Sequence, residues 1–416
     1  MTSLLAGKRI VIIIEGISIP AYTKLWDMAR ALRDAGAEIT VICPATLGAK
    51  PGFERLEDID IHRHPLYEAN TPYGFILEYA GALLFESWIL LKILLRGKIN
   101  VIHGASPPDL IFLLALPLRL FGVKFVFDHH DISPEMYEAK FRKRGWLHGL
   151  LKVMEYLSYR TCSLSIEPNK SYVDVALGRG GMKLENTVVV RSAPNLERIK
   201  LRSPNQLHRK GRDHLVGYVG VIEKQDCLDL LLQAISTITA KRSDVQFAVI
   251  GDGTELERIK QLASALELDA FITFHGWIDS DEMLCEILST CDLCVGPDGY
   301  SDYADWCTTI KILEYMAMRK PMVLFDLKES RVSAGESALY ARPDDVDEFA
   351  ANICRLLDDE ALRHQLGDAG YCRIMNGMSW ESQQEILIRA YAELLGRTAT
   401  AAAPTSDGAR AGDGQR

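Results

Sequence analysis

The amino-acid sequence predicts an α/β protein with two Rossmann-like, doubly wound domains that face each other across a cleft. Three observations predict this fold. The 416 residues exceed what one hydrophobic core usually organises, so we expect two domains of about 150 to 200 residues. Short β-branched runs alternate with helical patterns in both halves, which is typical of parallel βαβ units. A polar, basic stretch interrupts the alternation near the middle and marks a domain boundary.

The first domain is expected over residues 1–199. Its opening strand ends at Gly16 in a loop, and a helix over 24–35 then ends at Gly36, a typical helix C-cap. Helical patterns fit between most of the strands. The expected strands cover residues 9–15, 38–43, 59–64, 100–103, 124–127, 163–166 and 187–191.

A linker over 200–213 precedes the second domain, which is expected over 214–378. A further amphipathic helix is expected over 379–396, and the tail 397–416, rich in Ala and Gly, is predicted to be disordered. Strands are expected near residues 215, 246, 271, 293, 322 and 338, with helices near 228, 255, 280, 311 and 347.

The composition is that of an ordinary globular enzyme, with 48% apolar and 25% charged residues. A net charge of -9 argues against a general nucleic-acid binder, which needs a basic face. Nine cysteines without framework spacing favour a reducing cytosol, and Cys291 and Cys294 are interpreted as parts of a buried strand rather than zinc ligands. Residues 1–8 lack the pattern of a signal peptide, so we expect a cytoplasmic protein.

Two apolar stretches, 73–95 and 108–121, have two interpretations: core helices, or a surface that docks on a membrane. Charged residues interrupt the first stretch, so it does not predict a transmembrane span. The basic cluster at 140–144, beside Trp146, is either a solvated face or a contact for anionic headgroups.

Loops that follow strands carry the candidate chemistry, because ligands of open α/β sheets bind outside the carboxyl ends of the strands. Gly251 and Gly253 follow a strand and open a helix, where they form either a phosphate-binding turn or a plain connection. Thr308 and Thr309 stand at another helix start, suited to a diphosphate. Glu314, farther along that helix, suits a ribose diol.

Residues 128–131, Asp-His-His-Asp, close a strand of the first domain and are expected to face the same cleft. Alternation directs Asp128 and His130 to one side and their two neighbours to the other. A metal site, a catalytic or substrate-binding histidine and structural hydrogen bonding are the three interpretations.

Residues 217–395 resemble glycosyltransferase family 4, whose members are retaining enzymes with the GT-B fold. The segment that carries most of the resemblance is 311–317, and the first domain matches more loosely through 127–132 and 189–192. The family implies that the last helix packs back on the first domain. The other matching motifs are 217–220, 249–253, 274–278 and 320–321.

Carried over residue by residue, the resemblance makes Glu314 the ribose-binding second glutamate of the family's Glu-x7-Glu motif. The first glutamate falls on Trp306, so Asp305 or Asp302 is expected to replace it. His130 matches the histidine near the transferred sugar. The diphosphate-binding Arg and Lys fall on Val221 and Asp226, with Lys224 as the nearest replacement, and the candidate donor-binding residues are Gly16, Lys224, Gly251, Gly253, Trp277, Thr308, Thr309, Lys311 and Glu314.

The implied activity is transfer of a sugar, with retention, from a nucleoside diphosphate sugar to an acceptor hydroxyl, in polysaccharide or glycolipid synthesis. His130 and Asp305 are the catalytic candidates, and neither a metal nor a further cofactor is expected. The expected partners are the donor, a glycan or lipid-linked acceptor and, through the apolar helices, the inner face of the cytoplasmic membrane. The alternatives are a nucleotide-sugar epimerase of the same shape and a non-catalytic homologue that binds sugar nucleotide.

Overall fold

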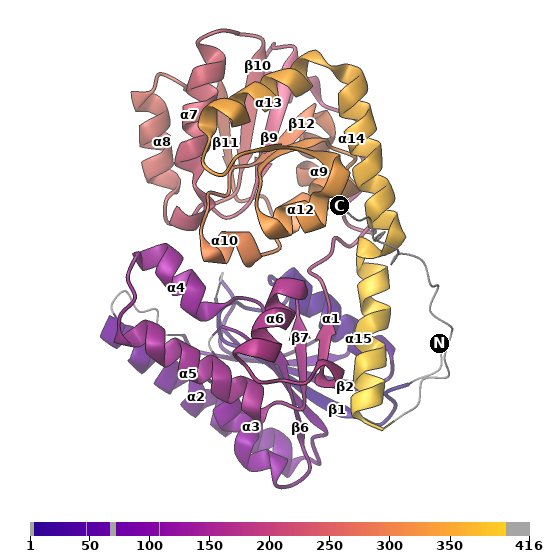
Figure 1. Ribbon diagram of the computed structural model, residues 1–416. Helices are drawn as coiled ribbons and strands as arrows, with labels where there is room; N and C mark the ends of the chain where they lie inside the picture. Colours follow the sequence, from indigo (N-terminus) through magenta and orange to yellow (C-terminus); the bar gives the residue numbers. More distant parts are fainter. Residues whose placement is uncertain (1–3, 47, 67–71, 108, 397–416) are drawn as a thin grey trace, which may run out of the picture.

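A computed structural model describes residues 4–46, 48–66, 72–107 and 109–396. Two α/β domains lie one above the other, each built on a twisted, mostly parallel sheet with helices on both faces (Figure 1). This arrangement confirms the predicted fold class. The predicted tail, 397–416, lies outside the described residues.

The N-terminal sheet has eight strands in the order β3-β4-β2-β1-β5-β6-β7-β8. All neighbours pair in parallel except β3 with β4. β3 was not predicted, because its residues are largely exposed and carry no buried run. The strands are β1 (Arg9–Ile14), β2 (Glu38–Pro44), β3 (Gly52–Leu56), β4 (Ile59–His64), β5 (Val101–Ala105), β6 (Lys124–Asp128), β7 (Leu164–Glu167) and β8 (Thr187–Val189).

Helices cover both faces of this sheet. α1 (Thr23–Asp34) packs on one face through an apolar stripe that includes Leu25, Met28 and Leu32. Residues of the other helices join a core cluster on the opposite face. These helices are α2 (Pro72–Leu95), α3 (Phe112–Arg119), α5 (Trp146–Thr161) and α6 (Lys170–Gly178), while α4 (Ser133–Phe141) lies at the edge that faces the C-terminal domain.

The C-terminal sheet has six parallel strands in the order β11-β10-β9-β12-β13-β14. Its strands are β9 (His214–Val219), β10 (Val245–Ile250), β11 (Ile272–Gly276), β12 (Leu293–Gly296), β13 (Met322–Phe325) and β14 (Ala338–Ala341). Its helices are α7 (Leu228–Thr239), α8 (Leu256–Ala265), α9 (Asp281–Thr290), α10 (Asp302–Trp306), α11 (Ile310–Ala317), α12 (Lys328–Ala334), α13 (Val346–Asp358) and α14 (Glu360–Arg373).

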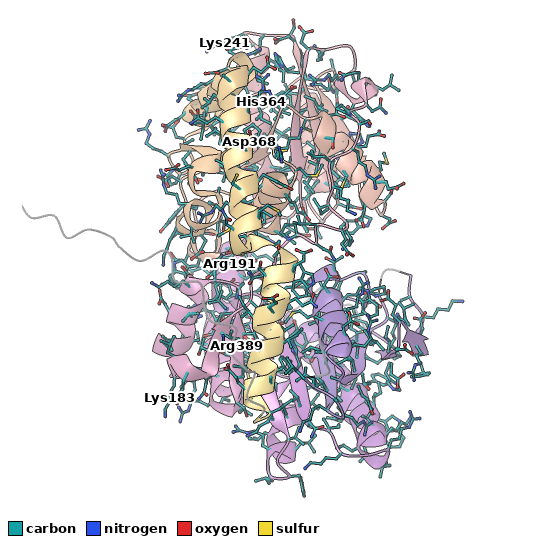
Figure 2. The ribbon with its side chains drawn as sticks, turned by 90° about the vertical axis from the view of Figure 1, so that its right-hand side faces the viewer. Lys183, Arg191, Lys241, His364, Asp368 and Arg389 are labelled. Atoms are coloured by element: carbon teal, nitrogen blue, oxygen red, sulfur yellow. The ribbon has the colours of Figure 1, made fainter. Side chains whose placement is uncertain are left out.

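The last helix, α15 (Trp380–Leu394), leaves the C-terminal domain and lies on the N-terminal one. A break at Asn376 and Gly377, where φ of the glycine is +115°, separates it from α14. Figure 2 shows the two helices following one another down one side of the molecule, with His364 on α14 and Arg389 on α15. The buried face of α15 joins the core beneath α1, so the chain end ties the two domains together.

Strand order also sets where a ligand site forms. It reverses between β1 and β5 in the first sheet and between β9 and β12 in the second. Such switch points leave a crevice at the carboxyl ends of the strands. A ligand site is therefore expected at the loops that follow these strands.

Candidate active site in the interdomain cleft

A cleft of about 470 Å³ lies between the domains. One wall is α4, and the other is made by the loops that follow β9 and β12, at the switch point of the C-terminal sheet. The exposed Lys224 lines this cleft and brings a cation to it. The lining residues are Glu135, Glu138, Ala139, Arg142, Lys224, Gln225, Cys227, Gly299, Tyr300, Ser301 and Asp302.

Lys311 lies behind the cleft wall and is buried in the C-terminal domain. Its Nζ is 2.8 Å from Asp298 Oδ1, 3.8 Å from Asp226 Oδ1 and 5.0 Å from the centre of the Tyr218 ring. Burial lowers the pKa of this amine, but Asp298, Tyr218 and Asp226 outweigh burial and the net shift is upward. Lys311 thereby joins α11 to the loops after β12 and β9.

Gly251 and Gly253 allow two loops to touch. A Cβ on Gly251 would lie 1.8 Å from the carbonyl oxygen of Gly220, and one on Gly253 would lie 2.3 Å from that of Ile222. The φ angle of Gly251, +140°, also disfavours any side chain. The loops after β9 and β10 are held together by this close approach, which accounts for both glycines without a ligand.

The start of α11 faces the N-terminal domain. The side-chain amide of the buried Asn169 donates to Thr308 Oγ1 at 2.9 Å and to the carbonyl oxygen of Trp306 at 2.8 Å. Thr309 is the N-cap residue of α11, yet its side chain makes no cap hydrogen bond and its buried Oγ1 has no partner among the described residues. A free hydroxyl beside free helix amides is suited to an anionic group.

Glu314 is half-buried on α11, about one turn beyond that helix start. Burial raises the pKa of its carboxyl to about 7, although Arg198 lowers it. Arg198 comes from the connection between the domains and pairs with both carboxylate oxygens of Asp281, at 2.7 and 2.8 Å. No local pattern pointed to Arg198, because its partners are distant along the chain.

His130 belongs to a buried network around Asp128. Its Nε2 lies 2.7 Å from Asp128 Oδ2, and its Nδ1 hydrogen-bonds the Tyr22 hydroxyl at 2.8 Å. Burial lowers the pKa of His130. Burial alone would raise the pKa of Asp128, but His130, Lys24 and His103 hold it well below its usual range. Nδ1 of His130 is thus engaged in a hydrogen bond, and Nε2 lies beside a carboxylate.

Helix α15 reaches the same network from the end of the chain. His103 Nε2 is hydrogen-bonded to Asp128 Oδ2 at 3.1 Å, and His103 Nδ1 to the Tyr391 hydroxyl at 2.6 Å. His129 and Asp131 point elsewhere, as alternation along the strand predicted. His129 contacts Tyr159 and Glu167, and Asp131 accepts a hydrogen bond from the Tyr303 hydroxyl at 2.8 Å. None of the described residues forms a cluster of three or more His, Cys, Asp or Glu able to hold a metal.

The segment that replaces the family's first glutamate forms α10. Trp306 is half-buried and packs, with Tyr303, against the core of the N-terminal domain. Asp305 Oδ1 accepts a hydrogen bond from the backbone N–H of Lys328 at 2.8 Å, which places this carboxylate at the start of α12. Asp302 is exposed on the cleft wall, 3.9 Å from Arg144.

The two remaining donor-binding candidates, Gly16 and Trp277, are exposed to solvent. Gly16 is exposed after β1, and a Cβ added there would have no atom of the described residues within 4 Å. Trp277 is 60% exposed after β11, the edge strand of its sheet, and its Nε1 donates to Asp279 at 2.6 Å. The structure thus places Lys224 in the cleft, Lys311 behind the cleft wall, and Thr308 against the N-terminal domain through Asn169.

The two-domain fold and the interdomain cleft together define the class of this protein, which has the GT-B fold. Sucrose-phosphate synthase from Thermosynechococcus elongatus superposes with a TM-score of 0.76 at 18% identity, over 94% of this chain and 99% of that one. A structure of Anabaena HepE in complex with UDP and glucose superposes with a TM-score of 0.69 at 17% identity, over 93% and 99% of the two chains.

Comparison of the sequence with models of protein families identifies the family within the GT-B class. The glycosyltransferase family 4 model matches residues 23–198, and the glycosyl transferases group 1 model matches residues 213–359. The two matches follow one another across both domains. The chain belongs to the family 4, group 1 glycosyltransferases.

Individual relatives agree with this assignment. An alpha-D-kanosaminyltransferase of Streptomyces kanamyceticus is 30% identical over 37% of this chain and 39% of its own length. A phosphatidyl-myo-inositol mannosyltransferase of Mycolicibacterium smegmatis is 24% identical over 83% of this chain and 81% of its own length. The chain therefore spans less than half of the first relative and most of the second.

Proposed function

We propose that this protein transfers a sugar, with retention, from a nucleoside diphosphate sugar to an acceptor hydroxyl. The observation that carries the proposal is the interdomain cleft of a family 4 protein, lined by Lys224 and placed at the switch point of the C-terminal sheet. A glycan or a lipid-linked glycan is the acceptor class. The lipid-acting relative from Mycolicibacterium smegmatis supports this class.

The diphosphate is assigned to Lys224 and to the amides at the start of α11. Support comes from the Thr309 hydroxyl, which has no partner among the described residues, and from the exposure of Lys224 in the cleft. Glu314 binds the ribose diol through its carboxylate oxygens. Lys311, which pairs with Asp298, supports the site by fixing the loop after β12.

Catalysis follows from the charge that develops in the reaction. The transition state resembles an oxocarbenium ion, and negative charge builds on the leaving diphosphate. Fixed donors beside the diphosphate stabilise this charge without reorganising, and the cleft orients the acceptor. His130 contributes beside the transferred sugar by exchanging its Tyr22 hydrogen bond for one to the substrate. Asp305 acts by positioning α12.

Transfer is proposed to need no divalent ion. Lys224 and the helix amides supply the positive field that a metal would otherwise provide. Activity should therefore persist after exhaustive treatment with EDTA. Loss of activity that Mg²⁺ or Mn²⁺ restores would contradict metal independence, while leaving the transferase itself supported.

One observation favours a second function, sugar-nucleotide binding without transfer. Trp306 occupies the position of the family's first glutamate and is packed against the N-terminal domain. A carboxylate for the transferred sugar would then be missing. This candidate predicts that nucleotide sugar binds while neither transfer nor donor hydrolysis occurs.

The deciding experiment begins with thermal stabilisation by UDP, GDP, ADP and TDP and by their common sugars. UDP comes first because the HepE structure holds it. One nucleotide should raise the melting temperature of the wild type and of the exposed control Glu336→Ala, but not that of Glu314→Ala. No shift with any nucleotide, in folded protein, would contradict the proposal.

Product analysis then separates the remaining functions. The stabilising donor is incubated with glycan and lipid-linked acceptors. A glycoside supports transfer, whereas an altered sugar still attached to its nucleotide identifies an epimerase. An unchanged donor after prolonged incubation identifies the non-catalytic homologue.

A further inference from the structure

The N-terminal domain exposes an unusual amount of apolar side chain on one side. Of the 27 large hydrophobic residues that are exposed among the described residues, 15 lie between residues 77 and 156. Scattered exposed leucines need no explanation, but a concentration of this kind in less than a quarter of the chain does. Three helices in this segment, α2, α3 and α5, carry most of these side chains.

Helix α2 is apolar on its solvent side as well as on the side that joins the core. Its solvent side presents Leu84, Trp88, Leu91 and Leu95, spaced so that they share one face. Its buried side carries Glu86, which is fully buried and whose two carboxylate oxygens have no hydrogen-bond partner in the described part of the chain. A helix whose outer side met water alone would carry polar side chains there instead of leucines and a tryptophan.

Two neighbouring helices repeat the exposed apolar stripe. On α3 the stripe consists of Leu113 and Leu116 and continues to Leu120, the residue that follows the helix and is 87% exposed. On α5 it includes Trp146 and Leu150, one turn apart on the same side. Each helix keeps its opposite side for the core of the domain.

The three stripes face the same way because the helices occupy one layer. α3 and α5 connect strands that succeed one another across the sheet, and right-handed crossovers place such helices on one face. α2, α3 and α5 also share the core cluster on that face, and Figure 1 shows them along the same outer side of the domain. We call the exposed apolar residues of these three helices the helical face.

The charged residues around the helical face indicate which kind of surface it contacts. Among the described residues from 77 to 160, ten Lys and Arg are exposed and no Asp or Glu is, although the whole chain has a net charge of -9. Three of the ten, Lys140, Arg142 and Arg144, lie beside the cleft and not on the helical face. Lys92 lies over the Trp88 ring at 4.9 Å, so a cation and an aromatic ring stand together at the edge of the stripe. Leucine, tryptophan and cations are what an interfacial helix presents to anionic lipid.

We propose that the helical face docks on the surface of an anionic membrane, with its leucines among the acyl chains and its cations at the headgroups. The contact is peripheral, since no described helix is long and apolar enough to cross a bilayer. α4 lines the cleft and packs against α5, so a docked protein holds its cleft beside the bilayer. An acceptor carried on a lipid would then reach the cleft without leaving the membrane.

Vesicle sedimentation tests the docking without donor or acceptor, so its result is independent of the proposed transferase. Wild-type protein should bind vesicles of phosphatidylcholine with phosphatidylglycerol, and bind pure phosphatidylcholine far less. Binding should weaken as salt rises, because surface charges are screened. Replacing Lys92 and Arg96 with Gln should weaken it by roughly fivefold for each cation removed.

A matched pair of triple variants tests the apolar part. Leu84→Gln, Leu95→Gln and Leu120→Gln together should weaken vesicle binding roughly tenfold or more. Leu184→Gln, Leu201→Gln and Leu207→Gln change three exposed leucines elsewhere and should leave binding unchanged. All six positions are exposed, so both variants should keep the wild-type melting temperature.

Three results would overturn the proposal. The first is no binding to anionic vesicles at low salt, and the second is an equal loss in the two triple variants. The third is a wild-type dimer, measured by light scattering, that the first triple variant alone converts to monomer. A second copy of the chain, and not a membrane, would then cover the helical face.

Discussion

Glu314 combines two properties at the scale of a single residue: a position suited to a ribose and a carboxyl group that is difficult to ionise. Burial raises its pKa to about 7, against 4.5 for the free group. A carboxylate accepts hydrogen bonds from both hydroxyls of a diol, whereas the neutral acid does so less well. Nucleotide binding and protein stability should therefore both depend on pH through this group.

We expect the affinity for nucleotide to rise as pH increases through about 7, because ionised Glu314 is the form that binds. Glu314→Gln should lower the affinity about tenfold to a hundredfold at pH 8 and flatten its pH dependence. Calorimetric titration between pH 6 and 8 measures both effects. A pH dependence that the variant retains would assign it to another group.

Ionisation of Glu314 favours nucleotide binding but lowers the stability of the native protein. The unfolded chain releases the Glu314 proton near pH 4.5 and the native protein only near pH 7, so this group disfavours the native state increasingly across that interval. Without nucleotide, Glu314→Gln should therefore raise the melting temperature at pH 8 and have little effect at pH 4.5. An equal shift at both pH values would contradict this account.

Helix α15 matters at the scale of an element because it completes a hydrogen-bond network in the other domain. Its Tyr391 is fully buried, and the hydroxyl contacts His103, which contacts Asp128. Asp128 in turn lies beside His130. The helix thereby fixes a candidate site residue that it does not touch.

Tyr391→Phe should lower the free energy of unfolding by about 1 to 3 kcal/mol, because His103 Nδ1 is left buried without its partner. Urea unfolding of purified protein measures the change. Tyr371→Phe is the matched control, a partly exposed tyrosine on α14. Equal losses in the two variants would show that the hydroxyl of Tyr391 has no special role.

Contacts between the domains act at the scale of the whole molecule. Ser171 donates to Glu329 at 2.6 Å and Tyr303 donates to Asp131 at 2.8 Å, each across the domain boundary. These two bonds hold α12 and α10 against the N-terminal domain, as Asn169 holds the start of α11. These bonds stabilise the present arrangement of the two domains against a more open one.

The double variant Ser171→Ala, Tyr303→Phe removes two of these hydrogen bonds. It should shift the molecule toward an open arrangement of the domains, since each bond contributes about 1 kcal/mol. Small-angle scattering of nucleotide-free protein should then give a larger radius of gyration. Tyr340→Phe, which removes a bond to Gly335 within one domain, should leave the radius unchanged. An unchanged radius in the double variant would show that other contacts keep the domains closed.

Local pattern was enough to predict most of the fold. Buried strands such as β1 and β6 appear as apolar runs, and α1 appears as a periodic stripe closed by Gly36, so each is recognisable from neighbouring residues. β3 was missed because an exposed edge strand has no such run. The carboxylate on α11 could be selected because helix position and residue type are both local properties.

Only the tertiary structure decided which groups are free to act. Asn169 bonds Trp306 from 137 positions away, and His103 bonds Tyr391 from 288 positions away. Whether α2 turns its leucines toward the core or toward solvent was likewise open in the sequence, because both arrangements use the same helical period. The sequence by itself determined most of the elements and the family, since both rest on local residue patterns. Three features follow from long-range packing, which no local pattern encodes: the burial of the Thr309 hydroxyl without a partner in the described part of the chain, the hydrogen bond of His130 to Tyr22, and the exposed helical face.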